Sequence, residues 1–398
     1  MHGIRRQLTI RGMPWLGLKR VAFIPVDQGG FNEVAVPPNW RQGIENRIYY
    51  ERDTKTGMDV SLRHYIYTTS YGRADLEGVV FDTVLMGVPG HPKDFVRPQY
   101  DHLRNEGFDA AAVVTLGRVS TGQGEIWPNA FWAWFNWVGG VGLWAMELTH
   151  VLGTIWDLYR PAPENDLGRF DNMSCGCGTH STAYTKMLLG WLDPSAITTA
   201  TLPDGEYDLH VVALLQPPPS GRSTAVRIDT SDGPLFVEAR LRVDQFDGPN
   251  MWNRGDSYAD PTDIGGVKSE GVIVYHLAGE QNPAGAPEIM DPLIHLKTLK
   301  ALNPGESFTA SGVTVTVVAA LAGGFRVRIV DANMVVVPEL YEMSPAQASG
   351  ELTSIGLKAK FTGPNATGSW VHRQSPLAGQ VVARGSTVTM VLKTGPIP

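Results

Sequence analysis

Apolar and polar positions follow two different patterns along the chain, and the change comes near residue 199. Before that point, continuous apolar runs at Arg20–Val26, Val79–Leu85 and Ala110–Leu116 predict buried strands. The partly alternating segment Val60–Tyr67 predicts another strand, and Pro92–Gly107 has apolar residues near one face of a helix. Strands separated by helical stretches indicate a mixed α/β unit.

Two more helices are predicted at the end of this first part. The apolar residues Leu143, Met146 and Val151 and the polar residues Glu147 and His150 recur at a spacing of three or four. Gly153 is the expected end of that helix, because glycine readily terminates helices. The second helix is expected over Ser181–Leu189.

From Thr199 onward, short alternating runs separated by turn residues predict an antiparallel β domain, a sandwich or a partly open barrel. These runs are Tyr207–Leu214, Ala225–Ile228, Leu235–Leu241, Gly271–Leu277, Val313–Val318 and Gly324–Ile329. The final segment predicts a helix followed by three strands, at Ser344–Ile355, Gly356–Phe361, Gly368–Gln374 and Ser386–Leu392. The predicted fold class is therefore α+β, with domains at 1–195, 196–332 and 333–398.

Composition excludes several classes of protein. Of the 398 residues, 43% are hydrophobic and 18% are charged, which is typical of a globular protein and not of a disordered one. The net charge of −7 argues against nucleic acid as a partner. Residues 335–398 carry five basic and three acidic side chains, a net +2, so the rest of the chain carries −9.

A membrane span and a secretory signal are not expected. Residues 126–146 contain no charged side chain, but Pro128 and several glycines interrupt them, so a strand, a turn and a helix are predicted instead. The basic residues near the N-terminus are not followed by the apolar core of a Sec signal peptide.

The helix with Glu147 and His150 is the strongest lead to chemistry. A helix with two histidines four residues apart binds zinc, and the glutamate after the first histidine acts as a base. Here Met146 stands at the first histidine position. Several segments in the same order resemble the immune inhibitor A-type metallopeptidases, a zinc protease family: Lys19–Asp27, Thr69–Gly72, His150–Tyr159, Phe170–Ser174, Lys186–Pro194, Leu235–Arg240, Gly271–His276 and Pro304–Phe308.

This resemblance, over about residues 15–332, implies a zincin-like domain with a protein or peptide substrate. It makes Glu147 the general base, His150 a zinc ligand and Asp157 the third ligand. Because Met146 is a neutral thioether, we expect weak zinc binding and impaired catalysis. The alternative is an active secreted zinc endopeptidase with a non-standard metal site.

Replacement ligands for such a site are Cys175, Cys177 and His180. Because one residue between two cysteines would strain a disulfide, free thiols or a metal site are expected there. Tyr184, like His180, is a candidate to hydrogen-bond a substrate carbonyl. An oxygen-rich loop could bind calcium through Asp244, Asp247, Asp256, Asp260 and Asp263.

The tail is similar to a second family, the PASTA domains. The resemblance lies in Val337–Leu340, Ala346–Leu352, Ile355–Lys358, Gln374–Gly379 and Gly385–Thr389. It implies one helix packed on a three-stranded sheet, and bacterial peptidoglycan as a partner through residues 335–398. The expected protein is thus a degenerate metallopeptidase with a wall-binding tail. It would be extracellular, on a cell surface or in a phage virion.

Overall fold

A computed structural model of the chain describes residues 13–53, 56–119, 122–126, 129–155, 157–158, 167–231, 233–248, 266–278, 293–296 and 300–395. The chain divides into two compact units. The first contains residues 1–199, 207–306 and 317–326, and the second contains 200–206, 307–316 and 327–398. The predicted division at residues 195 and 332 stays a prediction.

A mixed sheet forms the centre of the first unit. Its order is β2-β1-β4-β6-β5, with β3 also paired to β1. All pairs are parallel except β5 with β6. The strands are β1 (Gly17–Asp27), β2 (Ala74–Val80), β3 (Val84–Leu85), β4 (Ala110–Thr115), β5 (Gln123–Gly124) and β6 (Trp132–Asn136). The predicted strand Val79–Leu85 is thus divided between β2 and β3.

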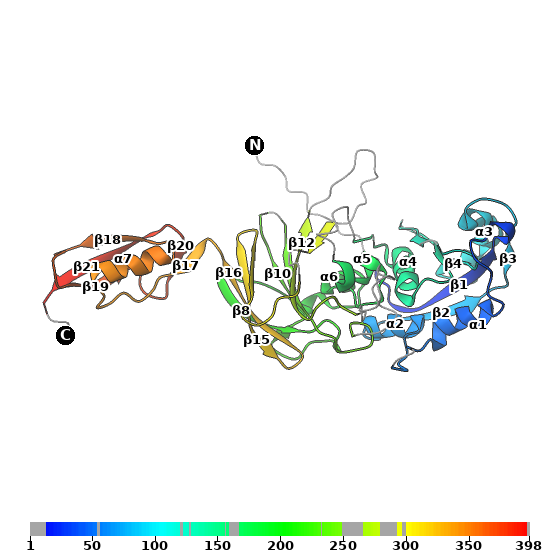
Figure 1. The fold of residues 1–398 in the computed structure, drawn as a ribbon, viewed down its shortest axis with the longest axis horizontal. Helices are drawn as coiled ribbons and strands as arrows, with labels where there is room; N and C mark the ends of the chain where they lie inside the picture. Colours follow the sequence, from blue (N-terminus) through cyan, green and yellow to red (C-terminus); the bar gives the residue numbers. More distant parts are fainter. Residues whose placement is uncertain are drawn as a thin grey trace. The chain divides into compact units, whose positions relative to one another are not determined.

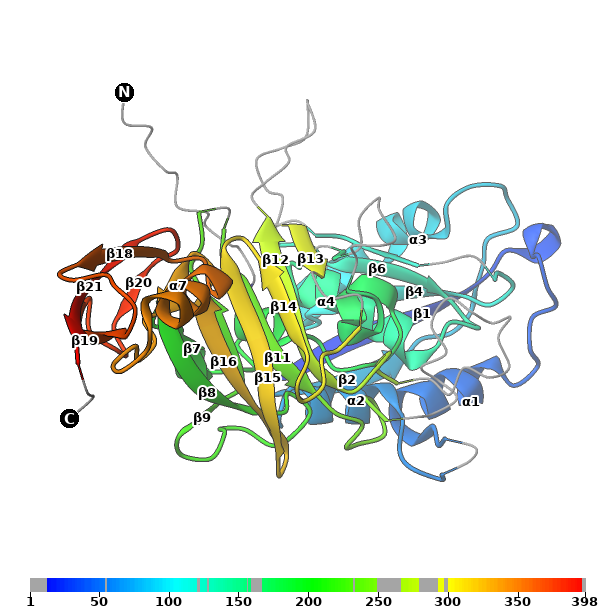
Figure 2. The ribbon, with the colours of Figure 1, turned by 60° about the vertical axis from the view of Figure 1, so that its left-hand side comes forward.

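Helices cover both faces of this sheet because its central strands are apolar on both sides. In β1, Val21 and Phe23 enter one core cluster, and Ala22 and Ile24 enter the other. Figure 2 shows the strands between α3 on one side and α1 and α2 on the other. The helices and helical turns of this part are α1 (Trp40–Glu45), η2 (Asn46–Tyr50), α2 (Leu62–Thr69), α3 (Pro92–Tyr100) and η3 (Asp101–Glu106), with η1 (Gly29–Phe31) after β1.

The prediction of a strand at Val60–Tyr67 is wrong, because this segment forms α2. Ser61 stands at the N-cap, where its hydroxyl and backbone N–H donate to Asp59 at 2.6 and 2.9 Å. The buried side chains then follow at helical spacing, at Leu62, Tyr65, Ile66 and Thr69. Aromatic and β-branched residues favour strands locally. A helix forms here because it buries these side chains together on the one side that faces the core.

Helix α4 (Val141–Gly153) lies on the same face of the sheet as α2 and is buried over nearly its whole length. Trp144 stacks on Phe135 of β6, with ring centroids 4.6 Å apart. The predicted helix end at Gly153 is confirmed, and Thr154 after it adopts the left-handed conformation that closes the helix. No helix in the described part of the chain is long and apolar enough to span a membrane, and the predicted strand, turn and helix are β6 and α4.

The middle of the chain forms two five-stranded sheets, ordered β13-β12-β11-β10-β7 and β14-β15-β16-β8-β9. Most neighbours are antiparallel, as predicted, but β7 with β10 and β8 with β9 are parallel. The bounds are β7 (Ile197–Thr199), β8 (Asp204–His210), β9 (Arg222–Ser223), β10 (Ala225–Ile228), β11 (Leu235–Arg240), β12 (Gly271–Ala278), β13 (Leu293–Leu296), β14 (Ser307–Ala310), β15 (Val313–Leu321) and β16 (Gly324–Asp331). Before them come η5 (Gly168–Phe170), α5 (Asn172–Cys175), α6 (Ala183–Leu188) and η6 (Pro194–Ala196).

The tail has the predicted helix and three strands. Helix α7 (Pro345–Ser354) packs on the sheet β18-β21-β19, as Figure 1 shows. Its start is specified locally, because Ser344 and Gln347 exchange backbone and side-chain hydrogen bonds in a capping box. The strands are β17 (Met334–Val336), β18 (Lys358–Thr362), β19 (Ser369–Ser375), β20 (Val381–Ala383) and β21 (Thr387–Thr394), and β17 pairs with β20.

Candidate functional site

Helix α4 and the segment after it bring together three side chains that the sequence singled out. Nε2 of His150 lies 3.0 Å from Oδ1 of Asp157 and 3.9 Å from Oε2 of Glu147. Nδ1 of His150 contacts the carbonyl oxygen of Ile155 at 2.5 Å. Since a carbonyl only accepts, Nδ1 carries a proton and Nε2 is the nitrogen directed at the two carboxylates.

Burial governs the charge of this group. Burial raises the pKa of Glu147 to about 7; the positive charge of His150 opposes the shift, and Asp157 adds to it. For His150, burial lowers the pKa, but the hydrogen bond to Asp157 and the two negative charges outweigh burial, so the pKa is raised. The result is a largely enclosed group in which His150 holds a proton between two acids.

Strand β5 crosses directly over this part of α4, a feature that the sequence reading missed. A Cβ added at Gly124 would lie 2.4 Å from the carbonyl oxygen of Glu147 and 2.6 Å from Cβ of His150. One added at Gly122 would lie 3.0 Å from Oε1 of Glu147. Alternate glycines in a strand are a signal of close backbone approach, and Gly122-Gln-Gly124 is such a pair.

The donor atoms present do not fit a catalytic zinc ion. Met146 is 5% exposed, and a Cβ added at Gly176 would lie 3.3 Å from its sulfur. A catalytic zinc takes three protein ligands, usually nitrogen, oxygen or thiolate. With Glu147 as base, the described residues beside α4 offer His150 and Asp157 as ligands. In the ranges that the structure describes, no group of three or more His, Cys, Asp or Glu residues is arranged to hold a metal ion.

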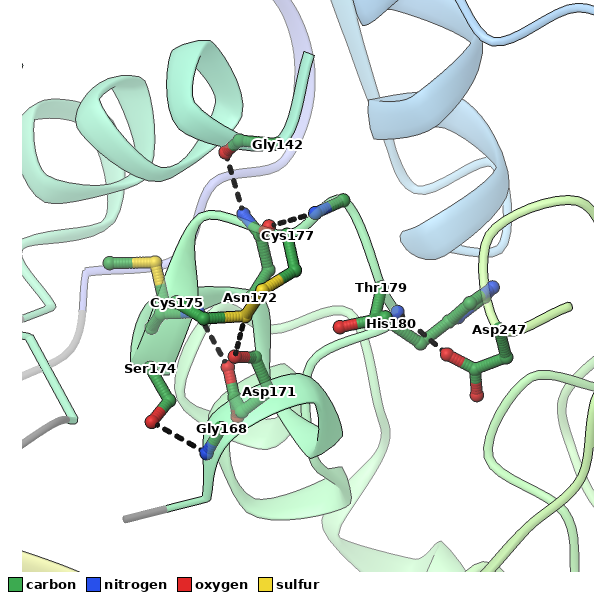
Figure 3. Close-up of a disulfide and its surroundings, with 12 residues drawn as sticks. Gly142, Gly168, Asp171, Asn172, Ser174, Cys175, Cys177, Thr179, His180 and Asp247 are labelled. Carbon is green, nitrogen blue, oxygen red and sulfur yellow. Dashed lines mark hydrogen bonds between the residues drawn. A yellow bond between two sulfur atoms is a disulfide. The ribbon is translucent and has the colours of Figure 1, made fainter. Parts of the chain in front are cut away.

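Cys175 and Cys177 are joined by a disulfide, contrary to the expectation of free thiols or a metal site. Gly176 between them has a φ of +60°, a backbone conformation that lets the chain reverse within three residues. Figure 3 shows the bond beside Asn172, whose Nδ2 donates to the carbonyl of Gly142 in α4 at 3.1 Å. As a disulfide, neither sulfur is a thiolate, so a metal site here would require reduction.

His180 and Tyr184 are both buried. Nε2 of His180 lies 2.7 Å from Oδ2 of Asp244, and its Nδ1 lies 2.9 Å from Nζ of Lys186. Tyr184 packs its ring edge-on against Phe236, with centroids 5.3 Å apart. Neither residue faces solvent, so a substrate or metal would reach them only if this region opened.

Lys186 lies at the end of this hydrogen-bonded chain, in α6. It is fully buried, donates to the carbonyl of Thr69 and lies 4.2 Å from the centroid of the Tyr71 ring. Burial lowers its pKa to about 7, although the negative charges of Asp247 and Asp244 act in the opposite direction. The lysine thereby joins α6 to α2 through polar contacts inside the core.

Arg240 of β11 organises a second buried group that sequence reasoning missed. Its Nη2 lies 2.8 and 2.9 Å from the two carboxylate oxygens of Asp247, and its Nη1 lies 3.3 Å from Oε1 of Glu238. It also donates to the carbonyls of His180 and Phe170. The sequence offers one signal of this buried charged group, because Glu238 and Arg240 interrupt the otherwise apolar run Leu235–Arg240.

Two of the five acidic residues proposed for calcium have protein partners. Asp247 pairs with Arg240, and Asp244 accepts from His180, whose positive charge and hydrogen bond hold the Asp244 pKa at about 2 despite burial. Asp256, Asp260 and Asp263 lie outside the described residues. The calcium site stays a prediction.

Comparison with protein families identifies a PASTA domain at residues 335–394. This confirms the predicted tail, and its helix and three strands agree with the expected architecture. No curated protein matches the chain significantly. The metallopeptidase resemblance of residues 15–332, and the zinc, substrate and ligand roles implied by it, stay predictions.

Proposed function

We propose that this protein binds bacterial peptidoglycan through its PASTA domain and that the remainder is a degenerate, catalytically impaired metallopeptidase scaffold. The PASTA domain at residues 335–394 carries the proposal, since such domains occur in cell-surface proteins and suggest binding to cell wall. The protein would act as a structural or adhesion component of a cell surface or a phage virion.

The donor set around α4 supports the second half of the proposal. Met146 replaces a nitrogen ligand with a neutral sulfur packed against Gly176, which leaves His150 and Asp157 as two zinc donors. Glu147 and His150 are retained inside the helix, where both are buried and Oε2 of Glu147 lies 3.9 Å from Nε2 of His150. The alternative is an active zinc endopeptidase. It is favoured by the carboxylates of Glu147 and Asp157, which both lie within 3.9 Å of Nε2 of His150.

Sedimentation with purified peptidoglycan tests wall binding. We expect the full chain to pellet with peptidoglycan and a chain ending at residue 332 to remain in the supernatant. A full chain that stays in the supernatant would contradict the proposal.

Metal content and casein hydrolysis test the impaired site. We expect little zinc and no hydrolysis for the natural protein, tighter zinc binding for Met146→His, and no change for the control Met146→Leu, which keeps an apolar side chain of similar volume. Stoichiometric zinc together with chelator-sensitive cleavage by the natural protein would establish the endopeptidase instead.

A further inference from the structure

The three-stranded sheet of the PASTA domain has one face packed under α7 and an opposite face that is directed to solvent except at Trp370, which is buried opposite Lys393. Val388, Met390 and Leu392 of β21 are buried in the domain core, whereas the residues alternating with them are not. We define the outer face by the exposed or half-buried residues that share this second orientation. They are Lys358, Lys360 and Thr362 of β18, Thr387, Thr389, Val391 and Lys393 of β21, and Arg373 and Ser375 of β19.

The outer face concentrates the positive charge of the domain. Four of the five basic residues in 335–398 lie on it, whereas the three acidic residues lie in α7 or in the segment before it. In the part of the chain that the structure describes, none of these four makes an ion pair, although exposed pairs form elsewhere in the protein. The charge is therefore available to an external partner.

The register spreads these cations over the face and places hydroxyl groups between them. Lys358 and Lys360 are two residues apart on one strand, or about 7 Å. Lys360 is opposite Thr389, which in turn is opposite Ser375 on the third strand. Each strand lies about 4.8 Å from the next, so the face presents cations and hydroxyl donors at repeated short intervals.

The titration of His372 is consistent with positive charge at the β19 edge of this face. Its pKa is lowered by desolvation first and then by the positive charges of Lys393 and Arg373. Two nearby positive charges without a compensating acid disfavour the protonated imidazole, which agrees with the direction of this shift.

We propose that the outer face binds a linear phosphodiester polymer of the bacterial wall, in addition to the peptidoglycan assigned to the domain. Lysine is an effective point-charge partner for phosphate, and threonine and serine hydroxyls donate to phosphate oxygens. A polymer with one negative charge at every repeat is complementary to cations repeated along and across three strands. This inference rests on the proposed wall binding. It adds that an anionic polymer of the wall strengthens the binding of the domain.

The test compares two wall preparations and two double variants of the full chain. Walls with their phosphodiester polymers intact are compared with peptidoglycan from which these polymers have been removed, and soluble poly(glycerol phosphate) serves as the isolated probe. Lys358→Gln/Lys360→Gln removes two charges from the outer face. Lys268→Gln/Arg227→Gln removes the same charge from exposed positions of the first unit and is the matched control.

We expect the natural protein and the control to bind poly(glycerol phosphate) and to favour intact walls over stripped ones. The outer-face variant should lose most of this preference, and its log-affinity against log-salt slope should be shallower by about 1 to 2. Equal binding of all variants to the probe, or a nucleic acid bound in preference to it, would overturn the inference. Loss of binding to stripped peptidoglycan by the natural protein would instead contradict the proposed function.

Discussion

Single residues of the first unit carry charge into its interior, and Arg240 is the clearest example. Its guanidinium is fully buried among Asp247, Glu238 and backbone carbonyls. Burial raises the pKa of Glu238 to about 7, while the positive charge of Arg240 and hydrogen bonds from Ala183 and Tyr275 oppose the shift. Removing one side chain of this group should strongly destabilise the fold, because the opposite charges that remain would be buried without their partner.

Arg240→Met should therefore lower the free energy of unfolding by about 3–5 kcal/mol, because it leaves two acids without their cation. Arg326→Met is the control, because it breaks an ion pair with Asp208 at the surface. The side chain of Arg326 is 44% exposed and that of Asp208 is 25% exposed. That change should cost less than about 1 kcal/mol. Denaturant unfolding of both variants measures the difference, and equal losses would show that burial does not set the strength of these pairs.

The fully buried lysine predicts a pH dependence of stability. Because the pKa of Lys186 falls from 10.5 to about 7 on folding, the unfolded chain binds a proton that the folded chain does not within this window. Stability from this group rises with pH between those values and is lost as pH falls toward the folded pKa. The slope is at most about 1.4 kcal/mol per pH unit.

Lys186→Met should remove that slope, although it also lowers stability overall by leaving the Thr69 carbonyl without its donor and by removing the contact with Nδ1 of His180. Urea unfolding of both proteins at several pH values between about 7 and 10 provides the comparison. Curves that stay parallel for the two proteins would show that Lys186 is already protonated in the folded state.

At the scale of elements, α4 depends on a close contact with the disulfide turn. A Cβ added at Gly142 would lie 2.1 Å from the backbone nitrogen of Gly178 and 2.3 Å from the carbonyl oxygen of Gly176. Backbone atoms cannot rotate away as a flexible side chain can. The absence of a side chain at position 142 therefore lets this turn reach the helix that bears Glu147 and His150.

Gly142→Ala should destabilise the first unit by about 1–3 kcal/mol, because two segments of backbone must separate. Gly350→Ala is a matched change in α7, where an added Cβ would meet nothing within 4 Å. There, alanine should stabilise the helix by about 0.5–1 kcal/mol. Thermal unfolding should move in opposite directions for the two variants, and a neutral Gly142→Ala would contradict the tight packing.

Elements were predictable where one local pattern dominated. The run Ala110–Leu116 and the alternating strand Ala225–Ile228 correspond to β4 and β10, and the capping residues of α7 mark its start. Helix α2 was misassigned because Tyr and Ile favour strands locally, and only the core beneath it shows that Leu62, Tyr65 and Ile66 share one side.

At the scale of the whole molecule, the PASTA domain contains its own core. Nine buried side chains within residues 337–392 contact one another as one cluster. The fragment 333–398 should therefore fold alone, with modest stability because small domains bury little surface. Circular dichroism should show one cooperative thermal transition, and a gradual loss of signal would show that the domain needs the rest of the chain.

The local pattern was sufficient to predict the tail with its helix and strands, and to place Glu147 and His150 on one helix. Asp157 was added to this group by the family resemblance. Contacts between residues that are distant in the sequence could be identified only from the tertiary structure. Arg240 reaches Phe170, Lys186 reaches Thr69, and β5 crosses α4 only because the sheets and helices pack that way. Buried charges have no fixed spacing in sequence, since each requires only a partner in space, whereas helix faces and strand alternation are periodic along the chain.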